Sequence, residues 1–393
     1  MHAARTVATT ISEAPRLTRI TAPLILTAWF AFASVAQAAG TALVFPIRDG
    51  DLHGLVDRDG KVILPAEYSQ PLQLSDGLIM ATKGTRTAFF DATGRMIIRP
   101  QEQTRGPFSD GLAPAVVADA MGKPALGYVD HDLKPAIRGD FRDVGPFSEG
   151  MAEVAVADEW GVVKRGYIDR SGKLVVPAKY EKTFPFSGGL GRVGPSRDPT
   201  RVVDRTGRDV TPEGIDFIGV QAEGMIRVWS ARKEGFIDAA GKLVIPPRFD
   251  QSAEFSEGLA RVFQSAPGGG RFGYIDKSGK MVIAPRFATA EAFSDGLALV
   301  REEGPDAGTV FIDATGKVVL RHEFDRVYPF SSGRAVFKSG NRYGYIDKSG
   351  KVAIPATWNF ARPFTGPLAA VVDGKQSAYI DVGGRVVWRS ERP

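Results

Sequence analysis

The sequence contains no cysteine and only four histidines. The absence of cysteine excludes disulfide bonds, thiolate metal sites and a cysteine nucleophile. His53, His131 and His322 share no common spacing, so we expect no zinc site and no other metal centre. The chain also has no phosphate-binding loop, no dinucleotide fingerprint after a strand and no nucleophile elbow. These absences lead us to expect no cofactor and no catalytic residues.

Long apolar runs are also scarce, and the one that stands out lies near the N-terminus. Arg5, Arg16 and Arg19 precede an apolar run over residues 20–35, which is followed by Ala36-Gln37-Ala38. This order is typical of a secretory signal peptide that is cleaved after Ala38. A membrane-spanning helix would need about 20 apolar residues. We therefore expect a periplasmic or secreted protein without a membrane span after cleavage; an uncleaved N-terminal anchor is the alternative.

Charge of one sign is not in large excess either, because the formal net charge is only +5. That value is too small to predict nucleic-acid binding. What the chain has in abundance is 45 glycines and 26 prolines among 393 residues. So many turn-forming residues predict numerous short strands rather than long helices.

The remaining chain, residues 39–393, consists of ten copies of one unit and is predicted to be a single repeat array. The clearest copies read Gly-Tyr-Ile-Asp-Lys-Ser-Gly-Lys and begin at Gly273 and Gly344. The units start near residues 54, 88, 127, 166, 201, 235, 273, 310, 344 and 378. All ten carry an aspartate at one position, with an average spacing of about 36 residues, and all but the unit with Leu133 have glycine three residues later. The aspartates are Asp57, Asp91, Asp130, Asp169, Asp204, Asp238, Asp276, Asp313, Asp347 and Asp381.

A second signature, Phe-Ser-Glu-Gly-Leu-Ala, follows each hairpin at a similar distance. It is clearest at Phe255 and Phe293, with looser copies at Phe108, Phe147, Phe186, Phe330 and Phe364. The copies at Leu74 and Gln221 lack the aromatic residue.

These patterns predict an all-β fold of ten three- to four-stranded units. Each Tyr-Ile-Asp-x-x-Gly-Lys-x-Val-Ile segment is typical of a β-hairpin, which Pro65, Pro177, Pro246 and Pro355 are expected to end. Leu-Ala-x-Val is then expected to be the third strand of the same unit. Adjacent apolar residues point to opposite faces of a strand, so both faces of each small sheet must be covered by neighbouring units.

Stacked units can form an open superhelical array or a closed ring. Ten units exceed the usual four to eight blades of a propeller, which favours the open, solenoid-like array. A closed propeller-like ring is the alternative, because residues 40–45 resemble a third strand without a hairpin and residues 378–388 a hairpin without a third strand. Pairing these two segments would close the ring.

The hairpins and turns together resemble the WG-repeat, or KWG-repeat, proteins of bacteria over about residues 42–388. The name-giving tryptophan is mostly absent, and its position holds Phe272, Tyr343, Arg165 or Glu234. The resemblance implies a β-repeat module that mediates binding, and it supplies no catalytic residues.

Four recurrent residue types could form a site. We expect the ten aspartates to stabilise turns, the serine of Phe-Ser-Glu-Gly to cap its turn, and the aromatic residues two positions before the aspartates to pack in the core. The basic residues after the turn glycine could instead line one edge and bind an anionic polymer. The alternative for them is a solubilising hairpin tip paired with the aspartate. The speculative ligand-binding row consists of Lys173, Lys242, Lys280, Lys317 and Lys351.

Two units depart from the pattern, one around Leu133 and one over residues 202–229. Such departures can mark functional sites, although we attribute them to sequence drift.

The sequence as a whole predicts an exported, non-catalytic binding or scaffold protein of the bacterial cell envelope. Its expected partner is an unidentified protein or an anionic envelope polymer. The alternative is an enzyme that acts on an envelope polymer in a groove or channel between repeats.

Overall fold

The computed structural model describes residues 43–390 except 120, 196–199 and 305–306. These residues are built from β-strands and turns, which confirms the predicted all-β class. The predicted signal peptide lies outside the described residues. Within the described part, no helix is long and apolar enough to cross a membrane.

The strands are short, and most have four to seven residues. In the first half of the chain they are β1 (Val44–Asp49), β2 (Leu52–Asp57), β3 (Val62–Tyr68), β4 (Gln73–Ser75), β5 (Leu78–Lys83), β6 (Arg86–Asp91), β7 (Met96–Gln101), β8 (Ala113–Ala118), β9 (Pro124–Val129), β10 (Pro135–Ser148), β11 (Met151–Ala157), β12 (Val163–Asp169) and β13 (Leu174–Tyr180). They are followed by β14 (Lys182–Ser187), β15 (Leu190–Gly194), β16 (Arg201–Asp204), β17 (Phe217–Ala222), β18 (Met225–Ser230), β19 (Lys233–Asp238) and β20 (Leu243–Phe249).

The last third repeats the same order, with shorter first strands in several sheets. It contains β21 (Gln251–Ser252), β22 (Leu259–Gln264), β23 (Arg271–Asp276), β24 (Met281–Phe287), β25 (Thr289–Ala290), β26 (Ala298–Arg301), β27 (Thr309–Ile312), β28 (Val318–Arg321), β29 (Arg326–Ser331), β30 (Arg334–Ser339), β31 (Arg342–Ile346), β32 (Val352–Trp358), β33 (Phe360–Ala361), β34 (Leu368–Asp373), β35 (Gln376–Asp381) and β36 (Val386–Arg389).

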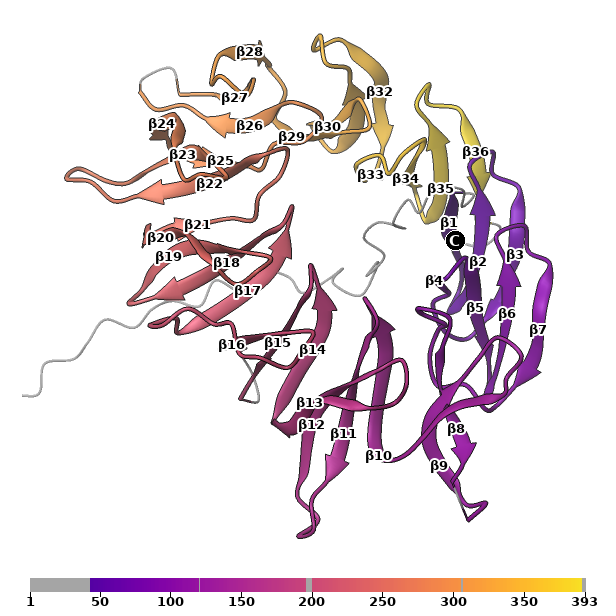
Figure 1. The fold of residues 1–393 in the computed structure, drawn as a ribbon. Coiled ribbons are helices and arrows are strands. Elements are labelled where there is room, and N and C mark those ends of the chain that lie inside the picture. Colours follow the sequence, from indigo (N-terminus) through magenta and orange to yellow (C-terminus); the bar gives the residue numbers. More distant parts are fainter. Residues whose placement is uncertain (1–42, 120, 196–199, 305–306, 391–393) are drawn as a thin grey trace, which may run out of the picture. The chain divides into compact units, whose positions relative to one another are not determined.

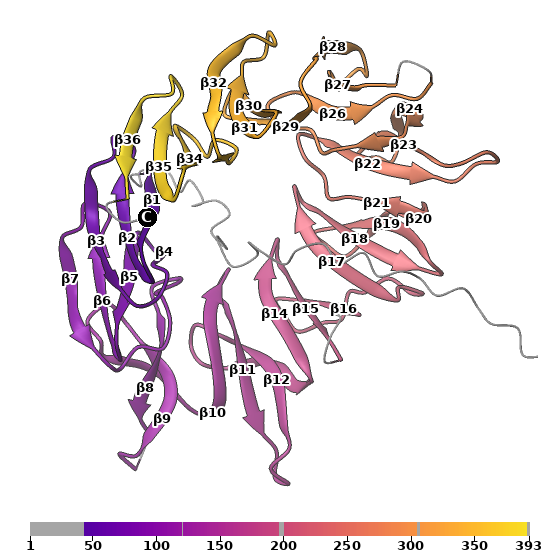
Figure 2. The ribbon, with the colours of Figure 1, turned by 180° about the vertical axis from the view of Figure 1, so that it is seen from behind.

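In the described residues these strands form nine antiparallel sheets, arranged as the blades of a β-propeller (Figure 1, Figure 2). A typical blade is β29-β30-β31-β32, whose first strand lies towards the centre of the ring and whose fourth strand lies outside. The ten sequence units give nine sheets because the long strand β10 belongs to two units and joins them in one six-stranded sheet. The closed ring was our alternative, and the favoured open array is wrong.

The predicted boundary between units is also wrong. Leu-Ala-x-Val is not the last strand of the preceding hairpin but pairs with the hairpin that follows it, so that Leu259 lies opposite Asp276. The same pairing places Leu368 opposite Asp381 and Val44 opposite Asp57. The ring is therefore not closed by pairing residues 40–45 with residues 378–388. A strand pairs most readily with its sequence neighbour across a short turn, which explains why each sheet is built from consecutive strands.

The first and last sheets are joined by apolar side-chain contacts and by one hydrogen bond from a tyrosine hydroxyl. Phe45 and Tyr379 are both buried, with ring centroids 5.7 Å apart. The Tyr379 hydroxyl donates a hydrogen bond of 2.7 Å to the Pro46 carbonyl. Leu368 and Val56 belong to the same apolar cluster. The two ends of the repeat array thus bury each other, as neighbouring blades do elsewhere in the ring.

The prolines do not end their strands as predicted. Pro65, Pro177, Pro246 and Pro355 each lie inside the outer strand of a blade. Proline is tolerated there because an edge strand needs no hydrogen bond on its outer side and because the register shifts at this point. The outer strand also passes close to the glycine of the third strand: a Cβ at Gly273 would lie 2.5 Å from the Ile283 carbonyl oxygen.

The core consists of separate layers between neighbouring blades. The adjacent residues Tyr274 and Ile275 point into different layers, one on each side of their sheet. This arrangement confirms the prediction that both faces of each sheet are covered. Seven of these layers contain the same edge-on or tilted ring pair, with centroids 4.8–4.9 Å apart. In six of them the pair joins the strand beside the outer strand of one blade to the Phe-Ser-Glu-Gly turn of the next. In the seventh, Tyr128 and Phe147 belong to the same six-stranded sheet.

Candidate functional site

The ten recurrent aspartates hold turns, as predicted. At Asp276, one carboxylate oxygen accepts hydrogen bonds from the backbone N–H groups of Ser278 and Lys280. Equivalent pairs of bonds occur at the other nine positions. The glycine that follows Ser278, Gly279, has a φ of 83°, a conformation that side chains other than glycine rarely adopt. These carboxylates therefore serve as hydrogen-bond acceptors for the backbone of their own turns.

The Phe-Ser-Glu-Gly turns connect neighbouring blades, a role that the sequence did not predict. The serine does not cap its own turn: Ser256 donates 2.7 Å to the Phe293 carbonyl of the next blade. The acidic residue reaches the next turn as well, since Glu223 accepts from the backbone N–H groups of Glu257 and Gly258. Similar bonds to the following turn are made by Asp76, Asp110, Glu149, Glu257 and Asp295.

The aromatic residues before the aspartates belong to the core, as predicted. They are buried in all eight units that have them, namely Phe89, Tyr128, Tyr167, Phe236, Tyr274, Phe311, Tyr345 and Tyr379. Four of the tyrosines, Tyr128, Tyr167, Tyr274 and Tyr345, also donate their hydroxyl to a backbone carbonyl 17 residues further along the chain. This row therefore has no surface for stacking a ligand.

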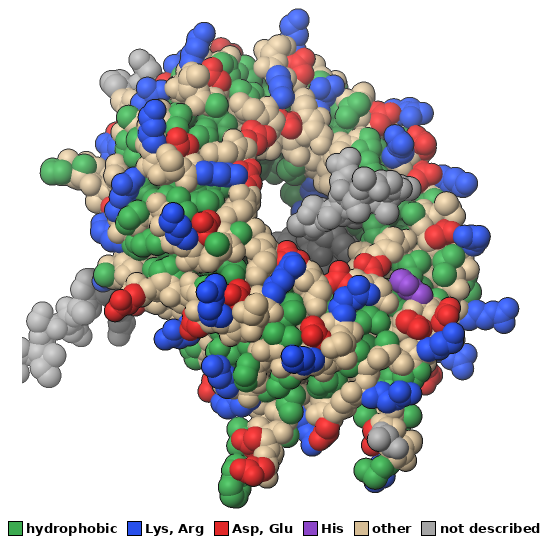
Figure 3. All heavy atoms as spheres, viewed as in Figure 1, with side chains coloured by type: hydrophobic (Ala, Val, Ile, Leu, Met, Phe, Trp, Pro, Cys, Tyr) green, Lys and Arg blue, Asp and Glu red, His purple; other side chains and the backbone are tan. Residues whose placement is uncertain are grey.

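The five lysines of the predicted ligand-binding row, Lys173, Lys242, Lys280, Lys317 and Lys351, are all exposed. Each lies on the turn between the outer strand of its blade and the strand beside it. Their Nζ atoms make no hydrogen bond or ion pair with another described residue. Arginine at this position behaves differently, because Arg95, Arg208 and Arg385 each pair with the turn aspartate at 2.9–3.1 Å. Figure 3 shows blue side chains distributed around the ring rather than gathered on one patch.

A second group of cations lies beside aromatic rings, mostly on the first and second strands of the blades. Arg192 lies 4.8 Å from the ring centroid of Phe184, and Arg326 lies 5.0 Å from that of Tyr328. Further pairs are Lys182 with Phe184, Arg227 with Trp229, Arg261 with Phe272, Lys338 with Tyr343 and Arg362 with Phe360. The sequence analysis missed these pairs because they follow no single repeat position and several of them combine residues from different strands.

The positions that hold tryptophan in the name-giving motif contact neighbouring segments. Arg165 pairs with Asp143 at 2.7 Å, and the Tyr343 ring lies 5.7 Å from that of Phe360. At the same position, Glu234 is buried and accepts from Trp229 Nε1 and from Ser252. Tryptophan is thus replaced by other side chains that still join separate strands.

Buried carboxyl groups are few, and no pair of them forms an acid–base site in the described residues. Burial raises the pKa of Glu153, and the nearby Asp143 carboxylate adds to this effect. Asp143 is already paired with Arg165, however. A shallow hollow of about 320 Å³ contains Glu302 and Glu303, each of which is paired with an arginine. Among the described residues, no group of three His, Asp or Glu side chains could hold a metal ion.

The two irregular units keep the architecture by other means. Leu133 takes the place of the turn glycine with a φ of 60° and donates to the Asp130 carbonyl, so that the turn is preserved. In the other unit, Gln221 replaces the phenylalanine and accepts a 3.0 Å hydrogen bond from Ser187 of the preceding blade. The turn at Leu133 and the contact of Gln221 with the preceding blade are thus both kept, although the residues depart from the repeat pattern.

Comparison with solved structures gives matches with low identity. One is a eukaryotic initiation factor, with 13% identity, a TM-score of 0.44, and coverage of 89% of this chain and 96% of that chain. A second is the tricorn protease, with 14% identity, a TM-score of 0.25, and coverage of 88% and 44%. A third is PorZ, a surface component of the type-IX secretion system of Porphyromonas gingivalis, with 11% identity, a TM-score of 0.25, and coverage of 88% and 56%. At these TM-scores, no functional conclusion follows.

A search of curated proteins gives no match. The family described as "WG containing repeat" does match, at residues 54–84, 127–160, 166–193, 235–265, 272–304, 311–343 and 343–375. These segments cover more than half of the chain and contain the glycine and turn positions that build the interfaces between blades. The chain therefore belongs to the family of proteins made of WG containing repeats.

Proposed function

We propose that this protein is an exported, non-catalytic binding or scaffold protein of the bacterial cell envelope, which binds an anionic polymer through the lysines on its outer turns. The exposed, unpaired Nζ atoms of Lys173, Lys242, Lys280, Lys317 and Lys351 carry this proposal.

The hydrogen bonds of the recurrent carboxylates support a non-catalytic role. General acid–base catalysis needs a carboxyl group that is free to exchange a proton with a substrate. The turn aspartates instead accept two backbone N–H groups each, and acidic residues such as Glu223 accept those of the next blade. The repeat thus uses its acidic residues to hold the ring together.

The lysines remain available for a ligand. One lysine on each of several blades, repeated along the ring, suits a polymer with regularly spaced negative charges, because many weak contacts act together. Such contacts are weakened by salt, since the charges are exposed to solvent.

Binding of the mature protein to poly(glycerol phosphate) tests this proposal. We expect the affinity to fall as the salt concentration rises, and the Lys280→Gln/Lys317→Gln variant to bind about tenfold more weakly than the wild type. The matched control is Lys83→Gln/Lys233→Gln, which removes the same charge from lysines already paired with Glu67 and Asp250.

An equal loss of affinity in the two double variants would show that net charge, and not the lysine row, drives binding. Shortening of the polymer during the assay would instead support the alternative, an enzyme that acts on an envelope polymer. Export is tested separately by sequencing the N-terminus of the cell-derived protein, which should begin at Ala39.

A further inference from the structure

The interface between the blades β29–β32 and β33–β36 combines cations and aromatic rings near the centre of the ring. Arg326, Lys338 and Tyr343 lie directly opposite one another on β29, β30 and β31. Residues opposite each other in antiparallel strands project from the same face of the sheet. Tyr343 contacts Phe360 of the next blade at 5.7 Å between ring centroids, so this face is the one that meets β33–β36.

The rings at this interface are only partly covered. Tyr328, Tyr343 and Phe360 are half-buried, whereas the core tyrosine Tyr345 on the same blade is fully buried. The Lys338 ammonium lies 6.0 Å from the Tyr343 ring centroid. The Arg326 guanidinium lies 5.0 Å from the Tyr328 ring centroid. Each cation is therefore held beside an accessible aromatic surface.

The charges at this interface are not neutralised, in contrast to those of two other blades. Arg227 pairs with Glu234 and Glu254, and Arg261 pairs with Glu291. Neither Arg326 nor Lys338 forms an ion pair with any described residue.

The carboxylate closest in sequence, that of Asp325, forms no ion pair with Arg326 or Lys338. Asp325 accepts a 2.6 Å hydrogen bond from the Gly340 backbone N–H group, at the turn after β30. The interface thus presents two cations that form no ion pair with a described residue, Arg326 and Lys338, beside half-covered rings.

We propose that this interface is a second binding site, specific for an acidic saccharide unit. An aromatic face packs against the apolar face of a sugar ring, and a nearby cation forms a charge-assisted hydrogen bond with a carboxylate or phosphate of the same sugar. Among the residues that the structure describes, no aromatic ring lies beside the Nζ atoms of the lysine row, so the row recognises charge only. This site adds recognition of the sugar itself, and it does not depend on the lysine row.

Calorimetric titration with a tetrasaccharide of alternating glucuronate and N-acetylglucosamine tests the site. We expect the mature wild-type protein to bind this probe and to bind a neutral N-acetylglucosamine tetrasaccharide at least about tenfold more weakly, because the neutral probe lacks the charge-assisted bond. Lys338→Gln and Tyr343→Leu should each weaken binding of the acidic probe about tenfold, whereas Tyr343→Phe keeps the ring and should bind like the wild type. Glucose 6-phosphate in place of glucuronate shows whether carboxylate or phosphate is preferred.

The matched control is Lys182→Gln, which removes an exposed lysine beside Phe184 on a different blade. Equal binding of the acidic and neutral probes, equal loss in Lys182→Gln, or inorganic phosphate binding as tightly as the tetrasaccharide would overturn the proposal. Because Lys338 is partly exposed, Lys338→Gln tests the site even if Tyr343→Leu does not fold. Lys280→Gln/Lys317→Gln should leave this binding unchanged, which separates a failure of this site from a failure of the lysine row.

Discussion

At the scale of single residues, the sequence predicted the turns well because their chemistry is local. The bonds of Asp276 span only two and four residues, so the spacing Asp-x-x-Gly-Lys contains all of their geometry. Even Leu133, which breaks the pattern, keeps the turn by adopting a positive φ. The role of the serine was predicted wrongly, because its hydrogen-bond acceptor lies on another blade. Ser256, for example, donates to the carbonyl of Phe293, 37 residues further along the chain.

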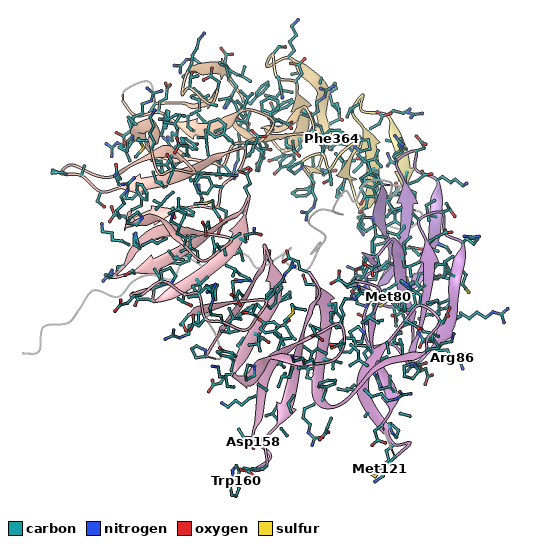
Figure 4. The ribbon with its side chains drawn as sticks, in the orientation of Figure 1. Met80, Arg86, Met121, Asp158, Trp160 and Phe364 are labelled. Atoms are coloured by element: carbon teal, nitrogen blue, oxygen red, sulfur yellow. The ribbon has the colours of Figure 1, made fainter. Side chains whose placement is uncertain are left out.

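We expect Asp276→Ala to lower the free energy of unfolding by about 1 kcal/mol, as the loss of a comparable side-chain cap does in a helix. Two backbone N–H groups and the Ser278 hydroxyl lose their acceptor in this variant. Asp276→Asn should lose less, because the amide oxygen can still accept from the backbone. Urea denaturation measures the difference. Trp160→Ala is the control, since Trp160 is 82% exposed at a hairpin tip and its loss should not change stability (Figure 4). Equal stability of Asp276→Ala and the wild type would contradict this account.

At the scale of strands and turns, the sequence showed both repeated signatures but not that the aromatic residue of one blade packs against the Phe-Ser-Glu-Gly turn of the next. Sequence spacing shows that an aromatic residue and a Phe-Ser-Glu-Gly turn recur, yet not that Tyr274 of one blade packs on Phe293 of the next. The same limit explains the wrong assignment of Leu-Ala-x-Val, since periodicity alone does not show where one repeat ends. The sequence could not predict the cation–aromatic pairs either, because residues such as Lys338 and Tyr343 lie on different strands and become neighbours only when those strands pair.

We expect Glu223→Ala to lower the free energy of unfolding by about 1–2 kcal/mol, because two backbone N–H groups of the next turn lose a charged acceptor. The matched stabilising variant is Ser332→Asp. Ser332 occupies the corresponding turn position with a φ of 53°, a conformation that Asp295 already adopts one blade earlier. If the introduced carboxylate reaches the turn of the last blade, the variant should be more stable by up to about 1 kcal/mol. Urea denaturation checks both, and an unchanged stability of Glu223→Ala would show that these bonds contribute little.

At the scale of the whole folded unit, the repeat predicted ten units, whereas the structure has nine sheets because two units share one sheet, and the repeat did not predict that the sheets close into a ring. Closure depends on the angle between neighbouring blades, summed around the ring, and no single unit contains that sum. The structure shows how the ends are joined: Tyr379 uses its hydroxyl on Pro46, as Tyr274 does on Glu291 within the array. A ring closed by repeated contacts has no weak end, so we expect its turns to contribute to stability together.

Acid should therefore destabilise the whole ring at once. A Ser or Thr hydroxyl two residues later donates to each of six turn carboxylates, and the pKa of each of them is lowered. At Asp91 the bond from Thr93 is the main cause and lowers the pKa to about 2. Because the pKa is lower in the folded protein than in the unfolded chain, where it is about 3.9, the stabilisation is complete above about pH 4 and is lost as the pH falls towards 2. We expect the urea midpoint to drop over this range in one cooperative transition, with Thr93→Ala flattening the dependence slightly. A midpoint that stays constant between these pH values would show that the turn carboxylates do not stabilise the ring through their charge.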